Sequence, residues 1–387
     1  MKKIIIIISV LFIAAAAFMT ASCDNNSDDI PVVRFIRPVD PAMGDKLLEN
    51  VSMGATIAVI GDHLGDVCRI TFNDKDALLN PTLVTPHSII VTVPGTMPDS
   101  VSNKMYLETK SGIKSEFAVS VIIPSPYIEA IDCQYASAGS DLVITGSYFF
   151  ARPDGSVDVI FPGNYKAVIK SVTESKIVCT VPEGADIEGP ISITSAYGTS
   201  RSSFNWRNTE GIFCNFSDPT STWNPWGMSR FGTEDGCDGQ YLHLYGSVGS
   251  WAWPANEEQL MWINPAGTTL IGDGDVADYA LCFEYNIDKW DCTPMIVWFN
   301  GPAVEQSVDG TEAQYHWKPY ETGFTADKWQ TITIPLSDFN TSKDESETRS
   351  LTDKSAIVNF HMMPFGAADG PGELDVKIDN VRIIKIK

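Results

Sequence analysis

Tryptophan is absent from the first 205 residues of this chain, and basic residues and histidine are scarce throughout. The 387 residues include five histidines, and 27 lysines and arginines stand against 49 acidic residues, which gives a formal charge of −22. Phosphate backbones are bound by clustered Lys and Arg, so this balance argues against a nucleic-acid-binding protein. The eight cysteines form no CxxC pair and no paired Cys/His spacing, which argues against a zinc site.

Three cysteines, Cys68, Cys133 and Cys179, lie at strand positions and are expected to be buried thiols. A disulfide between Cys282 and Cys292 is left open, because seven cysteines beyond Cys23 cannot all pair.

The sequence also lacks the residue patterns of hydrolases. Glycosidases set two carboxyl groups about 5–9.5 Å apart, and the E-x-D-x-x-E arrangement that would bring them together on a strand is missing. There is no H-E-x-x-H motif, and the loop GDGDVA is not followed by the helix that a dinucleotide site needs. Asp273, Asp275 and Asp278 in and after that loop are weak candidates for calcium ligands, and an exposed acidic turn is the simpler interpretation. We therefore predict no catalytic residue and no cofactor, with only a structural calcium left open.

The first thirty residues have the parts of an export signal. Lys2 and Lys3 precede an apolar run over 4–19, which is shorter than the about 20 residues of a spanning helix. The following Thr20-Ala21-Ser22-Cys23 resembles a bacterial lipoprotein processing site, although Thr20 stands where leucine is commonest. This resemblance implies a signal peptide over 1–22, a lipid on Cys23 and an acidic tether over 23–30. Acidic residues after the lipidated cysteine resemble the signal that places Bacteroidetes lipoproteins outside the outer membrane; the alternative is an anchor facing the periplasm.

Residues 31–124 and 125–206 are two copies of one unit. At spacings of 85 to 89 residues the following positions correspond: Gly54/Gly139, Gly61/Gly146, Phe72/Phe161, Val93/Val181, Pro94/Pro182, Gly112/Gly198 and Phe117/Phe204. Each copy alternates apolar and polar residues in short runs separated by Gly, Pro or Asp turns, which predicts a small immunoglobulin-like sandwich. The I-x-G and T-V-P phrases, the latter at 92–94 and 180–182, resemble the IPT/TIG family. We interpret both copies as spacers.

Residues 207–387 predict an all-β domain of another kind, a jelly-roll sandwich. Its candidate strands lie at 211–217, 241–246, 278–287, 294–300, 314–318, 329–335, 356–363 and 373–386. The phrases NFSD, KWQTITIPLSDF and ELDVKIDNVRIIKIK, in this order, resemble carbohydrate-binding jelly rolls.

All ten tryptophans lie from residue 206 onward, which is more than a core of this size requires. We assign Trp206 and Trp329 to structure. A flat indole can cover the C–H face of a sugar ring, so the others are candidate platforms. Trp251 and Trp253 of SWAWP are the strongest, because residues i and i+2 of a strand share a face about 6.5–7 Å apart. The next candidates are the tryptophans in or beside loops: Trp223, Trp226, Trp290 and Trp317.

Alternation in MIVWFNG places Trp298 with Asn300 on the face opposite Val297 and Phe299. By the same argument Glu284 and Asn286 share a polar face, where they are expected to bond the rim of a sugar.

The whole arrangement resembles the surface glycan-binding proteins of Bacteroidetes polysaccharide utilisation loci. That resemblance implies non-catalytic capture of a polysaccharide, a TonB-dependent transporter and its lid lipoprotein as partners, and a monomeric, lipid-anchored protein at the cell surface. A Trp-rich and Lys/Arg-poor site favours a neutral β-glucan of the xyloglucan, mixed-linkage glucan or laminarin type. The alternatives are a polysaccharide hydrolase or lyase whose carboxylates pair only in the fold, and a protein-binding surface adhesin.

Overall fold

The protein is described by a computed structural model over residues 29–217, 231–248, 270–291, 294–301, 312–364 and 372–387, together with the backbone of 222–223 and 261–264. These residues fall into two compact units that divide after Pro124. Among them, no helix is both long and apolar enough to cross a membrane. Cys23 and its flanking residues lie outside the described part of the chain.

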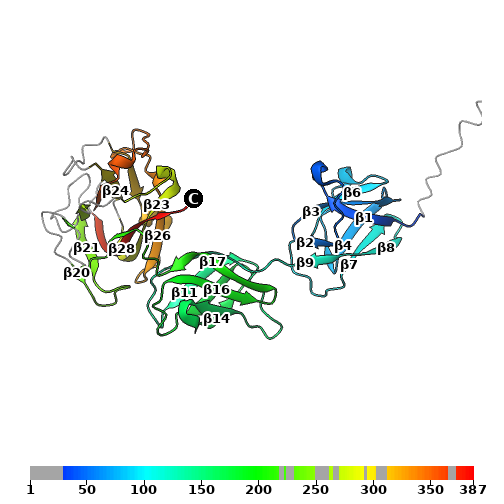
Figure 1. Ribbon diagram of the computed structural model, residues 1–387, viewed down its shortest axis with the longest axis horizontal. Helices are drawn as coiled ribbons and strands as arrows, with labels where there is room; N and C mark the ends of the chain where they lie inside the picture. The colour runs from blue at the N-terminus through cyan, green and yellow to red at the C-terminus, as the bar shows by residue number, and fades with distance from the viewer. Residues whose placement is uncertain are drawn as a thin grey trace, which may run out of the picture. The chain divides into compact units, whose positions relative to one another are not determined.

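The first unit is an immunoglobulin-like sandwich (Figure 1). One sheet contains β1 (Val32–Pro38), β3 (Thr56–Asp62) and β6 (Ser88–Thr92). The other contains β5 (Lys75–Asp76), β4 (Val67–Phe72), β7 (Lys104–Thr109) and β8 (Lys114–Ala118). A parallel pair joins β2 (Asn50–Ser52) to β9 (Ser120–Ile122), and two single 3-10 turns, η1 (Pro41–Met43) and η2 (Pro81–Leu83), lie in the connections. Alternate residues of these strands, such as Ile57 and Val59, fill the core between the sheets.

The second unit begins with another sandwich of the same kind. One sheet has the order β10 (Tyr127–Ile131), β11 (Asp141–Ser147), β15 (Lys176–Thr180) and β14 (Val168–Val172). The other has the order β13 (Tyr165–Lys166), β12 (Asp158–Phe161), β16 (Gly189–Ser195) and β17 (Gly198–Trp206), with η3 (Pro162–Asn164) before β13. Trp206 ends β17 inside the core, where its ring packs edge-on against Phe161 at 4.8 Å between centroids. Its structural assignment is confirmed.

The repeat in the sequence corresponds to the same backbone device in both sandwiches. Gly61 and Gly146 each lie opposite a bulge, in β1 and in β10 respectively. At each glycine a Cβ would lie 1.9 Å from a carbonyl oxygen, that of Val32 or that of Tyr127. Only glycine permits this close approach of two strands.

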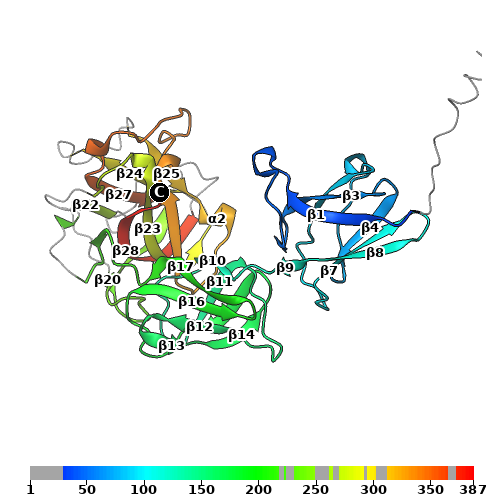
Figure 2. The same cartoon turned by 45° about the vertical axis from the view of Figure 1, so that its right-hand side comes forward.

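The C-terminal domain is a larger sandwich of two antiparallel sheets, which we call the β28 sheet and the β24 sheet (Figure 2). The β28 sheet contains β20 (Phe231–Gly232), β21 (Tyr241–Val248), β28 (Gly372–Lys385), β23 (Tyr279–Trp290) and β26 (Gln330–Pro335), with β18 (Ile212–Cys214) also paired to β28. The β24 sheet contains β19 (Thr222–Trp223), β22 (Met261–Asn264), β27 (Asn359–Pro364), β24 (Met295–Asn300) and β25 (Gln314–Trp317). Short helices lie between strands: η5 (Val276–Asp278), α2 (Pro319–Thr322), η6 (Leu336–Asp338) and η7 (Lys354–Ala356). Each of the eight strands predicted for this domain is present, and the all-β prediction is confirmed.

Inward residues of the two sheets meet in one apolar core. Leu281 and Phe283 of β23 contact the same cluster as Val297 and Phe299 of β24. Residues of opposite parity on each strand therefore lie on the outer faces of the sandwich, and these faces position the candidate sites.

The cysteines correct two of the expectations. Cys133 and Cys179 are buried thiols, but Cys68 is exposed. Cys282 is a free, buried thiol whose Sγ lies 3.5 Å from Thr333 Oγ1, so the disulfide left open for it is not formed. Cys292 lies outside the described residues.

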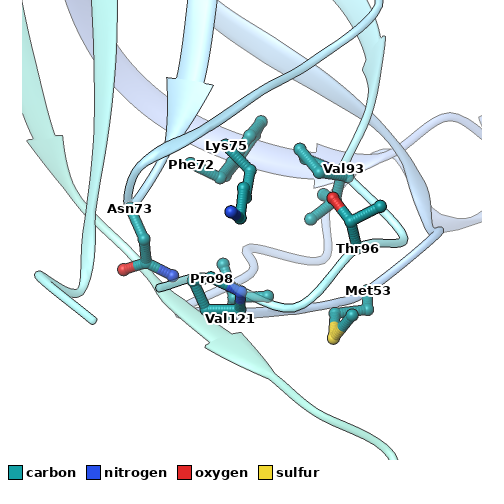
Figure 3. Close-up of a pocket in the computed structure, with 9 residues that line it drawn as sticks. Met53, Phe72, Asn73, Lys75, Val93, Thr96, Pro98 and Val121 are labelled. Atoms are coloured by element: carbon teal, nitrogen blue, oxygen red, sulfur yellow. The ribbon is translucent and has the colours of Figure 1, made fainter. Parts of the chain in front are cut away.

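A small cavity in the first sandwich is too narrow for a sugar. Figure 3 shows Met53, Phe72, Lys75 and Val93 around it. Its volume is about 10 Å³, which is room for about one water molecule.

Candidate functional site

The outer face of the β24 sheet is built from residues that alternate with the core. Ile296 and Trp298 of β24 form a small apolar cluster with Met363 of β27, separate from the main core. Val297 and Phe299 point the other way into the core, so the alternation predicted for Trp298 is confirmed. Asn300 follows at the same parity as Trp298.

Strand pairing places Trp298 in a row that crosses the sheet. Its neighbours in register are Gln314 on β25 and His361 on β27, and His361 is in turn opposite Trp262 on β22. The Trp298 indole lies flat against the His361 imidazole, with 4.6 Å between centroids and 7° between planes. Cross-strand partners of this kind fix a ring in one orientation.

Several polar atoms on this face are buried without use in the fold. Trp298 and Asn300 are each 2% exposed and Gln314 is 0% exposed. Trp298 Nε1, Gln314 Nε2 and both side-chain polar atoms of Asn300 have no hydrogen-bond partner in the described part of the chain. Each such atom costs about 1–3 kcal/mol of stability, so the described chain leaves four costly polar atoms on this face without a partner of its own.

The face carries little charge. Burial lowers the pKa of His361 to about 3, so this imidazole is neutral at physiological pH. Burial also lowers the pKa of His316 of β25, although its hydrogen bond to Glu345 at 2.8 Å opposes the shift. The strands β24, β25 and β27 contain no aspartate or glutamate. These three strands therefore supply no pair of carboxylates of the kind that glycosidases use.

Glu284 and Asn286 lie on a different sheet from Trp298. They belong to β23, on the outer face of the β28 sheet that is covered by the second immunoglobulin-like domain. Both oxygens of Glu284 accept hydrogen bonds from Arg382, at 2.7 and 2.8 Å, and the carboxylate is fully buried. The interpretation of Glu284 as a rim residue for sugar is therefore wrong.

Trp290 and Trp317 are core residues. Both are 4% exposed, and their rings pack edge to face at 4.9 Å between centroids. They were candidate platforms in or beside loops, but they end β23 and β25, and the bulge between Ile287 and Lys289 turns Trp290 into the core.

The remaining candidate tryptophans lie where side chains are not described. Trp223 is in β19, of which the backbone alone is described, and Trp226, Trp251 and Trp253 lie outside the described residues. In the chain, SWAWP falls between β21 of the β28 sheet and β22 of the β24 sheet.

The acidic loop after Ile271 is organised as a turn. Asp278 Oδ2 accepts the Asp275 backbone N–H at 3.0 Å, and Gly274 between Asp273 and Asp275 has φ 113°. Across the described ranges, no group of three His, Cys, Asp or Glu is placed to hold a metal ion.

Sequence reasoning missed His361 and Gln314. Alternation in VNFHMMP gives His361 the parity of Asn359 and Met363, and this signal was readable. The sequence does not predict that β27 and β25 pair on either side of β24, because strand order is not encoded in local periodicity.

Comparisons with known proteins agree with this architecture. Residues 206–385 match the family described as the surface glycan-binding protein B xyloglucan binding domain, and residues 126–206 match the IPT/TIG domain. A surface glycan-binding protein B from Prevotella bryantii is similar over 93% of this chain and 99% of its own, with a TM-score of 0.73 and 26% identity. Another, from a complex xyloglucan utilization locus in Bacteroides uniformis, shares the fold over 92% of this chain and 100% of its own, with a TM-score of 0.51 and 15% identity.

A curated IPT/TIG domain-containing protein of Bacteroides ovatus is 35% identical over 136 residues. The match spans 33% of this chain and 28% of that protein's length. In this chain an IPT/TIG domain precedes a C-terminal domain that matches the surface glycan-binding protein B xyloglucan-binding family, and the chain as a whole is similar to a solved surface glycan-binding B protein.

Proposed function

We propose that this protein binds a neutral polysaccharide at the cell surface without cleaving it, and that the C-terminal domain holds the ligand. The observation that carries the proposal is the outer face of the β24 sheet, where Trp298, Asn300 and Gln314 keep buried polar atoms without a partner in the described chain. These atoms weaken the fold, and a hydroxyl-rich ligand would pair them.

The ligand class follows from the charge of the face and of the chain. A neutral His361 and strands without carboxylates offer no attraction to an anionic polymer, and the chain's charge of −22 opposes one. A neutral β-glucan of the xyloglucan, mixed-linkage glucan or laminarin type fits best. The family match and the Bacteroides uniformis relative favour xyloglucan among these.

Trp251 and Trp253 are the proposed platforms, with Trp223 and Trp226 as further candidates, and the Trp298 face as their support. If a sugar ring covers about 100 Å² of an indole, the contact contributes at most about 2.5 kcal/mol, at about 25 cal/mol/Å². Association itself costs several kcal/mol, so two or three platforms leave a dissociation constant of about micromolar to millimolar. That range suits a protein that captures a polymer and then releases it.

The same proposal covers location and partners. A lipid on Cys23 would anchor the chain to the outer membrane, and the immunoglobulin-like domains would act as spacers that hold the binding domain away from the anchor. A monomer of this form would deliver glycan to a TonB-dependent transporter and its lid lipoprotein.

Affinity electrophoresis of the purified chain through gels that contain xyloglucan, mixed-linkage glucan, laminarin, pectin or alginate tests the proposal. We expect retardation by the neutral β-glucans alone. Retardation in no gel would favour a protein-binding adhesin. A parallel assay for new reducing ends should stay at background, and steady release of sugar would identify a hydrolase and overturn the proposal.

A further inference from the structure

A groove lies between the second immunoglobulin-like domain and the C-terminal sandwich, on the face opposite the proposed polysaccharide site. The two domains belong to one compact unit. Direct bonds hold them together: Gln134 accepts from Arg382 at 2.9 Å, the Gln134 backbone N–H donates to Thr331 Oγ1 at 2.8 Å, and Lys328 is paired with Asp132 at 2.5 Å. The walls of the groove are therefore fixed relative to each other.

The groove has the size of a small-molecule site and a mostly polar lining. Its volume is about 360 Å³, within the range of about 300–1,000 Å³ typical of ligand pockets. The immunoglobulin-like domain contributes Ser137 and Ser140, and the C-terminal domain contributes Asn286, Asp327, Trp329 and Lys377.

Asn286 is the group in this groove that points to a ligand. Its side chain is 5% exposed, and its Oδ1 has no hydrogen-bond partner in the described chain. The side-chain amide takes no part in the strand pairing, because the backbone of Asn286 pairs with that of Lys377 on β28. A buried acceptor of this kind is costly to leave unpaired.

The charges of the lining argue against an anion as ligand, because Asp235 and Asp327 offset the two lysines of the groove. Lys328 is paired with Asp132, and Lys377 lies 3.6 Å from Asp288. No group of three metal-ligating side chains occurs in the described ranges of the chain. What remains is a mixture of hydroxyl and ammonium donors, carboxylate and amide acceptors, and the edge of the Trp329 indole, which is 8% exposed.

We propose that this groove binds a short neutral saccharide, one or two sugar rings, whose hydroxyl groups donate to Asn286 Oδ1 and the Asp327 carboxylate and accept from Ser137 and Lys377. The site is separate from the one proposed for the polymer, because Asn286 lies on the β28 sheet and Trp298 on the β24 sheet. A fixed, narrow groove between two domains suits the end or a side branch of a glycan and not the middle of a chain.

Saturation-transfer difference NMR of the full chain with cellobiose or xylose at millimolar concentration tests the groove. The Trp251→Ala/Trp253→Ala background removes the proposed platforms, so that the remaining signal reports on other sites. We expect the cellobiose or xylose signal to persist there, and Asn286→Leu to weaken the affinity at least about tenfold, as expected for one lost hydrogen bond to a buried group. The matched control is Asn50→Leu, an exposed asparagine on β2, which should change nothing.

Leucine has the same branching and the same number of side-chain heavy atoms as asparagine and removes an unpaired acceptor, so Asn286→Leu should fold with an unchanged or higher melting temperature. A signal unchanged by Asn286→Leu, or no signal in the platform-free background, would overturn the groove proposal. Retention of Asn286→Leu in a xyloglucan gel should equal that of the wild type. If no glucan gel retards the chain but Asn286→Leu still weakens the saccharide signal, the proposed polysaccharide binding is refuted and the groove proposal stands.

Discussion

The buried ion pair of Glu284 and Arg382 should control how firmly the last two domains hold together. Arg382 is fully buried, donates twice to Glu284 and once to Gln134 of the immunoglobulin-like domain, and lies 5.5 Å from the Tyr135 ring centroid. Replacing Glu284 by leucine removes the anion and leaves the guanidinium buried without a counter-charge.

Removing one partner of a buried pair costs about 3–5 kcal/mol. For domains of this size each kcal/mol shifts the melting temperature by about 2–4 °C, so Glu284→Leu should lower it by roughly 6–20 °C. Differential scanning calorimetry of the chain measures this, and the affected transition should be that of residues 125–387, while the first domain melts as before.

The double replacement Glu284→Leu/Arg382→Met is the matched control, because exchange of both charges for apolar groups is often close to neutral. It should recover at least half of the loss, with the rest due to Gln134, whose carbonyl loses its donor. An exposed ion pair typically contributes less than about 1 kcal/mol. A loss of unfolding free energy below that value for Glu284→Leu would refute the claim that this pair is buried between the two domains.

Three further predictions concern the outer face of the β24 sheet, a buried aspartate of the C-terminal domain, and the glycines of the immunoglobulin-like domains. Asn300→Leu/Gln314→Met removes unpaired polar atoms from the β24 sheet, so the chain should melt no lower than the wild type and lose retention in a xyloglucan gel; full retention would contradict the role given to this face. Burial raises the pKa of Asp379 to about 8, so the stability it contributes is complete below its ordinary pKa of about 3.9 and is lost as the pH rises to about 8. Urea unfolding should therefore show a flatter profile from pH 4 to 8 for Asp379→Asn, and identical profiles would refute the assignment. Gly146→Ala should destabilise its domain far more than Gly95→Ala destabilises the first domain, because a Cβ at 146 would lie 1.9 Å from a carbonyl oxygen while at 95, where φ is not positive, it meets open space; equal losses of melting temperature would contradict the bulge argument.

Local periodicity was sufficient for most of the fold. Six of the eight predicted strands of the C-terminal domain have six or more residues and alternate visibly, and the paired glycines revealed the repeat. The strands β19, β20 and β22, of two to four residues, were missed because segments this short carry little periodicity.

The site was harder to predict because the exposure of a residue on an outer face depends on which other domain or loop packs against that face. Alternation correctly placed Trp298 and Glu284 on outer faces. It did not predict which sheet each residue belongs to, or that another domain covers Glu284. Glu284 is paired with Arg382, which also bonds Gln134, about 150 positions before Glu284 in the chain, and no local pattern reports this. Trp290 and Trp317 were misassigned because polar neighbours in sequence suggested loops, while both residues end strands that reach into the core.

The central claim is that tryptophans of the C-terminal domain hold a neutral β-glucan. Isothermal titration of the full chain and of its Trp251→Ala/Trp253→Ala variant with xyloglucan tests it most directly, with the melting temperature of each chain measured alongside. The account expects micromolar to millimolar binding by the wild type, and loss of binding by the variant at an unchanged melting temperature. Equal affinities for the two chains would contradict it, and a collapsed variant would show that these indoles belong to the core.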